Sequence, residues 1–147
     1  MRWFFTDELG SVRAAADGTG KVVEHFDYDE FGKSTTGSCP EFGFSGLQYD
    51  AESASYFAQA RFYSPQLGRF LAKDKERYIF PEIPESVNLY AYCRNNPVTF
   101  IDPQGTDCYI FYLPEWKGEA MADRKALAQK YGYDISKVHM IPMNNKQ

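Results

Sequence analysis

Short aromatic segments, separated by glycine and proline, occupy much of the sequence between residues 38 and 105. The densest segment covers residues 55–63 and is followed by Ser64 and Pro65, and residues 68–71 form another. Aromatic side chains favour strands, and short runs bounded by glycine or proline are typical of small antiparallel sheets. Because tyrosine, phenylalanine and tryptophan make up 17% of the chain, we predict a mainly β fold with an aromatic core.

The chain divides into three zones. Residues 1–37 contain turns, the clearest at 17–20, and a predicted strand at 21–28. Residues 38–105 add strands at 55–63 and 68–71 and a short helix at 88–94 that Asn88 would cap. Residues 106–147 change character, with a strand at 108–113, an amphipathic helix at 119–131 and a strand at 138–142. These three elements open a βαβ unit but cannot make an independent core, so we expect this α/β segment to be incomplete.

Charge, cysteine content and hydropathy argue against several classes of function. The net charge is −4 and the basic residues are scattered, which does not favour a nucleic-acid-binding protein. Cys39, Cys93 and Cys108 are widely spaced and form no CxxC pair, so neither a disulfide framework nor a structural zinc site is expected. No run reaches the ~18 apolar residues of a membrane span. We therefore expect no metal, no cofactor, no nucleic acid and no membrane span.

A series of motifs in a fixed order carries a resemblance to a known family. The motifs are FSGLQYD at 44–50, YFAQARFYSP at 56–65, LGRFL at 67–71, NLYAY at 88–92, NNPV at 95–98 and DPQG at 102–105. Together they resemble the RHS repeat-associated core domain, which ends the tyrosine-aspartate (YD) repeat shell of bacterial RHS proteins and of Tc toxin C subunits. Residues 6–13 and 28–32 resemble the last shell repeats. The resemblance implies shell repeats at 1–37, the core domain at 38–105, and the truncated start of a variable effector segment at 106–147.

The resemblance also implies a candidate site beside the DPQG motif. Many members of the family cut themselves just after this motif with an aspartyl-protease-like pair, which here would be Asp74 and Asp102. The cut would then fall in the Gly105-Thr106 region. Two neighbouring carboxyl groups do not readily ionise together, so one holds a proton and acts as the acid while the other activates water.

Each of these residues also has an ordinary structural interpretation. An aspartate before a proline, such as Asp102, is a common turn former, and Asp74 lies between two lysines as solvated surface acids do. Arg61 and Arg69 are flanked by aromatic residues, on which arginine side chains often stack. Either arginine could instead orient or polarise the reacting groups, and the sequence does not choose between them.

Two departures from the family pattern bear on the candidate site. Thr106 stands where family members usually have leucine. The stretch between Asp74 and Asp102 is longer than usual, and an inserted loop there could leave Asp74 in place or displace it.

The resulting functional prediction is a secreted or cell-surface fragment of a polymorphic toxin-like protein. It would close a β shell and free a C-terminal effector by self-cleavage. Its partners would be its own upstream shell, its downstream effector and an immunity protein for that effector. One alternative is a non-catalytic structural or surface scaffold. A weaker one places the activity in residues 106–147, for example as a toxin or peptidase-like domain. A pairing of Cys108 with His139 on the two strands of that segment is a separate possibility.

Overall fold

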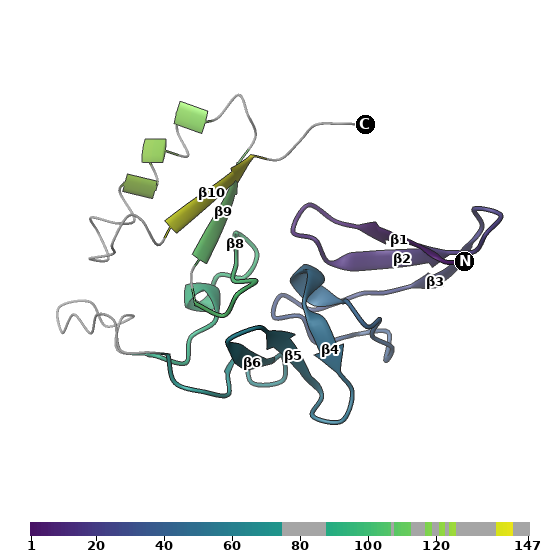
Figure 1. Cartoon of the computed structure of the whole chain (residues 1–147), viewed down its shortest axis with the longest axis horizontal. Coiled ribbons are helices and arrows are strands. Elements are labelled where there is room, and N and C mark those ends of the chain that lie inside the picture. The colour runs from purple at the N-terminus through teal and green to yellow at the C-terminus, as the bar shows by residue number, and fades with distance from the viewer. Residues whose placement is uncertain are drawn as a thin grey trace.

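The computed structural model describes residues 1–74, 88–106, 108–112, 117–118, 121–122, 124–125 and 138–142. The strands in these residues form three small sheets, with orders β1-β2-β3, β4-β5-β6-β7 and β10-β9-β8 (Figure 1). Most pairings are antiparallel, so the predicted mainly β fold is confirmed. Within the described residues, no helix is long and apolar enough to cross a membrane.

The first sheet is an antiparallel meander of three strands, β1 (Trp3–Thr6), β2 (Val12–Ala16) and β3 (Val22–His25). The predicted turn at 17–20 connects β2 to β3, and the Gly20 amide donates to the Asp17 carbonyl at 3.0 Å. Asp17 Oδ1 also accepts hydrogen bonds from the amides two and four residues further on, and Asp7 and Asp29 repeat this arrangement. Three similar aspartate-stabilised turns therefore follow one another along residues 7–33.

The second sheet contains β4 (Gln48–Asp50), β5 (Ser55–Ala58), β6 (Arg61–Ser64) and β7 (Arg69–Phe70). The prediction of one strand over residues 55–63 is wrong, because the chain reverses at Gln59 and Ala60 and forms the β5–β6 hairpin. Gln59 adopts the left-handed region, with φ of 53°, which permits the tight reversal. The predicted strand at 68–71 contains β7.

Aromatic side chains from neighbouring strands meet on the inner face of this sheet. Tyr56 pairs with Tyr63 across β5 and β6, and Tyr63 pairs with Phe70 across β6 and β7. All three are almost completely buried, and they share one core cluster with Phe44 and Tyr92. The predicted aromatic core is therefore confirmed.

Two tyrosine hydroxyls attach this core to the preceding turn. Tyr56 donates to the Gly32 carbonyl at 2.9 Å, and Tyr63 donates to the Phe31 carbonyl at 2.6 Å. The short 3₁₀ turn η1 (Phe44–Gly46) contributes Phe44 to the same core. The first and second sheets are thus joined through hydrogen bonds and packing around residues 31–46.

The predicted helix at 88–94 is wrong. Asn88 Oδ1 accepts the Tyr90 amide at 3.2 Å, which produces a turn instead of capping a helix. Ala91 then forms an isolated bridge with Arg69, so this stretch runs beside β7. Only the 3₁₀ turn η3 (Cys93–Asn95) follows, and its three residues all have positive φ.

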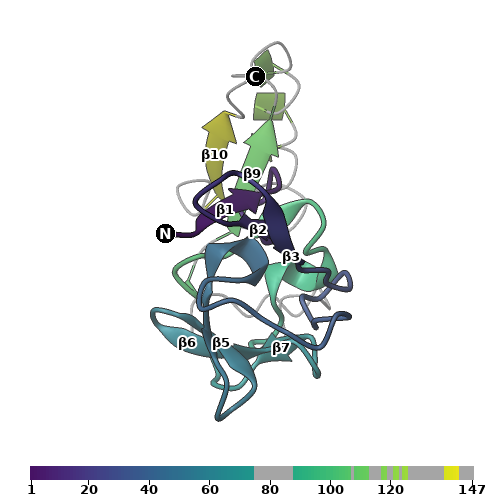
Figure 2. The ribbon, with the colours of Figure 1, turned by 90° about the vertical axis from the view of Figure 1, so that its right-hand side faces the viewer.

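The third sheet joins the end of the candidate core to the downstream segment. It contains β8 (Phe100–Ile101), β9 (Cys108–Tyr112) and β10 (Val138–Pro142) (Figure 1). β9 pairs with β10 in parallel, as expected of a βαβ opening (Figure 2), and pairs antiparallel with β8 on its other side. Of the predicted helix at 119–131, residues 121–122 and 124–125 are helical, and the rest lies outside the described residues.

Candidate functional site

A buried arginine, Arg61, lies at the centre of the candidate site. It begins β6, directly after the β5–β6 reversal, and shares the inner face of the strand with Tyr63, so only 8% of it is exposed. Its guanidinium carbon lies 3.6 Å from the centroid of the Phe70 ring. Arg69, the other candidate, is exposed and stacks over Tyr90 at 4.5 Å. Of the two arginines that the sequence offered, the fold places Arg61 in the site.

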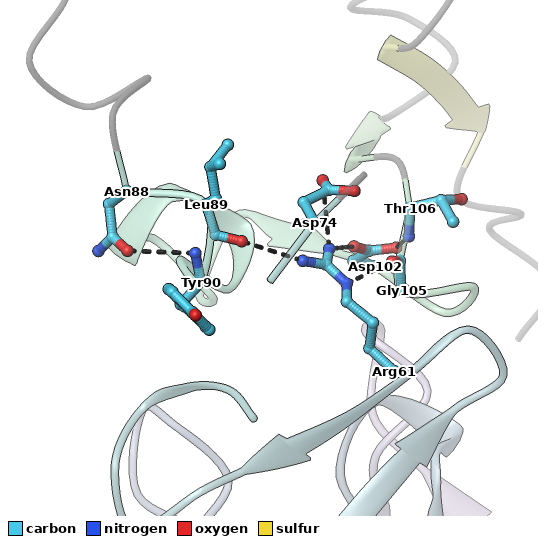
Figure 3. Close-up of polar contacts among 8 residues, drawn as sticks. All are labelled: Arg61, Asp74, Asn88, Leu89, Tyr90, Asp102, Gly105 and Thr106. Carbon is cyan, nitrogen blue, oxygen red and sulfur yellow. Dashed lines mark hydrogen bonds and ion pairs between the residues drawn. The ribbon is translucent and has the colours of Figure 1, made fainter. Parts of the chain in front are cut away.

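Both predicted aspartates face the same nitrogen of this guanidinium. Arg61 Nη2 lies 3.5 Å from Asp74 Oδ2 and 3.6 Å from Asp102 Oδ2 (Figure 3). Asp102 is 4% exposed, whereas the Asp74 side chain is 27% exposed and so remains accessible to water. One guanidinium therefore faces two carboxyl groups.

The peptide group between Gly105 and Thr106 is held at both of its polar ends. Arg61 Nε donates to the Gly105 carbonyl oxygen at 2.7 Å. The Thr106 amide donates to Asp102 Oδ1 at 2.9 Å. The carbonyl of this peptide group therefore faces a cation, and its nitrogen faces a carboxyl group (Figure 3). Thr106, which departs from the usual leucine, takes part through its backbone.

The β5–β6 hairpin shapes the backbone around this peptide group. The Ala60 amide donates to the Gln104 carbonyl at 3.2 Å. Gly105 has a φ of 67°, and a Cβ added there would lie 2.6 Å from the Ala58 carbonyl oxygen. Only glycine fits this position, because the conformation is left-handed and the backbone of the hairpin lies directly against it.

The carbonyl of Leu89 links the remaining parts of the site. It accepts one hydrogen bond from Arg61 Nη1 at 3.3 Å and another from the Asp74 amide at 3.0 Å. It therefore orients both the guanidinium and the backbone that carries Asp74. Sequence reasoning missed Leu89 and Ala58 because each acts through its carbonyl group, which side-chain identity does not reveal.

Across the described parts of the chain, no cluster of three or more His, Cys, Asp and Glu side chains is suited to hold a metal ion. The alternative pair, Cys108 and His139, occupies different rungs of the β9–β10 ladder, because Cys108 pairs with Val138 and His139 with Tyr109. The site can bring a polarised carbonyl, a proton donor and a water-activating carboxylate to one peptide group.

Comparison with known proteins identifies the family to which this fold belongs. The sequence profile of the teneurin YD-shell family matches residues 2–98. The tRNA nuclease WapA of Bacillus subtilis is 35% identical over 102 residues, which cover 65% of this chain and 4% of WapA. Toxin subunit YenC1 of Yersinia entomophaga is 29% identical over 113 residues, which cover 71% of this chain and 11% of YenC1.

A solved structure of a toxin complex has a similar fold. The crystal structure of TcdB2-TccC3-Cdc42 matches 71% of this chain and 5% of its own chain, with a TM-score of 0.59 and 27% identity. This chain therefore spans only a small fraction of the length of these relatives. The residues matched by the family profile contain the first two sheets together with Arg61 and Asp74, whereas Asp102 and the peptide group between Gly105 and Thr106 lie beyond them.

Proposed function

The chain belongs to the teneurin YD-shell family, and from this premise we propose that it is the core of an RHS-type toxin-like protein that cuts itself between Gly105 and Thr106. One observation carries the proposal: the Gly105 carbonyl contacts Arg61, while the Thr106 amide contacts Asp102. The Asp102 contact also occurs in the turns at Asp7, Asp17 and Asp29, where it stabilises the turn alone. The contact of Arg61 with the Gly105 carbonyl is additional, and in our proposal it prepares this peptide bond for hydrolysis.

The proposed domain roles are those that the family resemblance implies. Residues 1–37 would be the last repeats of a shell, residues 38–105 would close it, and residues 106–147 would begin a variable effector. A nuclease and a toxin subunit among the relatives support this assignment. The partners would be the upstream shell, the effector and an immunity protein that neutralises it, and the protein would act after secretion or at the cell surface.

The contacts support a proposed role for each side chain in the reaction. Asp74, the more exposed acid, takes a proton from a water molecule whose oxygen attacks the Gly105 carbonyl carbon. The negative charge that develops on the carbonyl oxygen is stabilised by Arg61 Nε. Protonated Asp102 donates its proton to the Thr106 nitrogen as the carbon–nitrogen bond breaks. The products are a Gly105 carboxyl group and a Thr106 amine.

The test is the intact mass of the full-length protein, with Asp102→Asn as the matched variant. We expect two fragments in the wild type, divided after Gly105, and one uncut chain in the variant. The substitution keeps the size of the side chain and an oxygen for the Thr106 amide but removes the proton donor. A single uncut mass in both proteins would contradict the proposal.

The ion pairs of Arg61 also support a second candidate function, a non-catalytic scaffold. Arg61 connects β6 to the segment after β7, through Asp74, and to the β8–β9 connection, through Asp102. In a scaffold this network would only stabilise the fold. An uncut wild-type chain that is destabilised by Asp102→Asn would favour this function.

A further inference from the structure

We propose that Phe70 is a positioning residue for self-cleavage, whose ring face holds the Arg61 guanidinium in the plane that the Gly105 carbonyl requires. This inference rests on the proposed function and adds to it a residue that touches neither the scissile bond nor the attacking water. It begins from the short distance of 3.6 Å between the Arg61 guanidinium carbon and the Phe70 ring centroid. At this distance the cation lies directly against the face of the ring.

The Phe70 ring is itself held firmly. Phe70 has no exposed surface, and Tyr63 and Tyr92 are equally buried. Tyr63 meets the Phe70 ring edge to face at 6.0 Å and 70°, and Tyr92 meets it at 5.5 Å and 71°. Rings that interlock in this way inside a close-packed core leave little room for rotation. Phe70 therefore presents a fixed surface to Arg61.

The other contacts of the guanidinium do not stay constant during the reaction. Arg61 Nε contacts the Gly105 carbonyl oxygen, which becomes an oxyanion and then part of a carboxyl group. Arg61 Nη2 contacts Asp74 and Asp102, and both exchange protons in the proposed mechanism. The Phe70 ring keeps the same charge distribution throughout. It can therefore hold the plane of the guanidinium while the partners within that plane change charge.

The loss of this surface has a specific consequence for the rate of cutting. A guanidinium that tilts away from its plane misaligns Nε with the carbonyl oxygen, and small misplacements slow a reaction strongly. We expect a tenfold lower rate when the attraction of the ring is removed, a factor that corresponds to about 1.4 kcal/mol. The attraction is at the upper end for such contacts because the pair is shielded from water.

The experiment replaces Phe70 in the full-length protein with phenylalanines that carry one, two and three ring fluorines. Fluorination withdraws electron density from the ring face and weakens its attraction for a cation while the shape of the side chain is nearly kept. The matched control is the same series at Phe44. The Phe44 ring contacts the rings of four tyrosines, Tyr28, Tyr56, Tyr63 and Tyr92. Phe44 belongs to the same core cluster and is also buried.

The measurement is the first-order rate of cutting, together with the melting temperature of the same series in the uncut Asp102→Asn protein. We expect the logarithm of the rate to fall in step with fluorination at Phe70 and to stay constant at Phe44. The melting temperature should change in both series, because fluorination also alters the contacts between rings, so the rate is the measurement that separates the two positions. Cutting that proceeds at the same rate throughout the Phe70 series would overturn the positioning role and leave the proposed function intact. A wild-type chain that never cuts would overturn both.

Discussion

The substitution Gly105→Ala tests most directly how the β5–β6 hairpin shapes the candidate site. Gly105 is buried and has a φ of 67°, and an added Cβ would lie 2.6 Å from the Ala58 carbonyl oxygen. That oxygen belongs to the backbone of a paired strand and cannot rotate away as a flexible side chain would. We therefore expect the loop that carries Gly105 to move instead.

The expected cost has two parts. An alanine in the left-handed region costs about 1–2 kcal/mol relative to the ordinary region. Overpacking against a fixed backbone adds about 1–3 kcal/mol. Relief of the clash moves the contact from 2.6 Å to the 3.4 Å of ordinary van der Waals separation, which carries the carbonyl away from Arg61 Nε. A shift of this size lowers the rate of a positioned reaction by about a hundredfold.

The matched control is Gly37→Ala. Gly37 has a φ of 81° but is exposed, and an added Cβ there would meet no atom within 4 Å. The control therefore carries the conformational cost without the clash. Urea unfolding of both variants measures the free energy of unfolding, and gel electrophoresis over time measures the rate of cutting.

The expected result is a larger loss of stability for Gly105→Ala than for Gly37→Ala, with cutting slowed only in the former. Equal losses of stability would show that the Ala58 carbonyl does not restrict this position. Normal cutting by Gly105→Ala would show that the close approach of the hairpin is irrelevant to the reaction.

Further predictions concern the buried charges and the tyrosine core. Arg61→Ala should lower the free energy of unfolding by about 3 kcal/mol, because it removes the hydrogen bonds to the Gly105 and Leu89 carbonyls as well as the contact with Asp102. Arg69→Ala, which removes an exposed stacking contact, should cost less than about 1 kcal/mol, and urea titrations of both variants compare the losses. Burial raises the pKa of Tyr56 and of Tyr92, so both stay neutral in the fold while an unfolded tyrosine ionises near pH 10. Stability should therefore fall as the pH rises above about 10. Because the chain has 11 tyrosines, the absorbance of these two is taken as the difference between the wild type and the Tyr56→Phe and Tyr92→Phe variants, and this difference should appear only together with unfolding. A difference that appears at pH 10 in the folded chain would contradict the burial of these hydroxyls.

The aromatic pattern predicted the class of fold well, because burial of alternate residues is a direct consequence of strand geometry. The hairpin at Gln59 and Ala60 could not be predicted, since it contains neither glycine nor asparagine, the residues that usually mark such reversals. The failed helix at 88–94 has a comparable cause. Asn88 can stabilise a helix start or a simple turn, and pairing of Ala91 with Arg69 decides in favour of the turn.

The candidate site was predictable in part. The family motifs predicted Asp74, Asp102 and Gly105 as site residues, and all three contact one arginine, Arg61, in the fold. The alternation of buried and exposed residues along the strands could have distinguished Arg61 from Arg69. Arg61 lies two residues from a buried tyrosine on the same face, whereas Arg69 alternates with the buried Phe70. That reasoning required the strand boundaries, which the missed hairpin concealed.

The regular aspartate turns at 7, 17 and 29 were visible only in part from the sequence. Each turn has a glycine three residues after the aspartate, at Gly10, Gly20 and Gly32, but their flanking residues differ widely. A search for the spacing alone, without regard to composition, would have found them. Their common hydrogen bonds show that a repeat can be conserved in geometry within one chain while its residues diverge.

The bond between Gly105 and Thr106 lies in the connection between two strands that pair with each other. β8 ends at Ile101, β9 begins at Cys108, and the rungs Phe100–Ile110 and Ile101–Tyr109 hold them together. Hydrolysis of a bond in this connection would remove no hydrogen bond of that ladder. Cleavage would produce a nicked hairpin, and release of the downstream segment would then require β9 to separate from β8. The lifetime of the nicked state would accordingly depend on strand separation, a mechanical step that temperature, denaturant or pulling force can accelerate without any change in the chemistry.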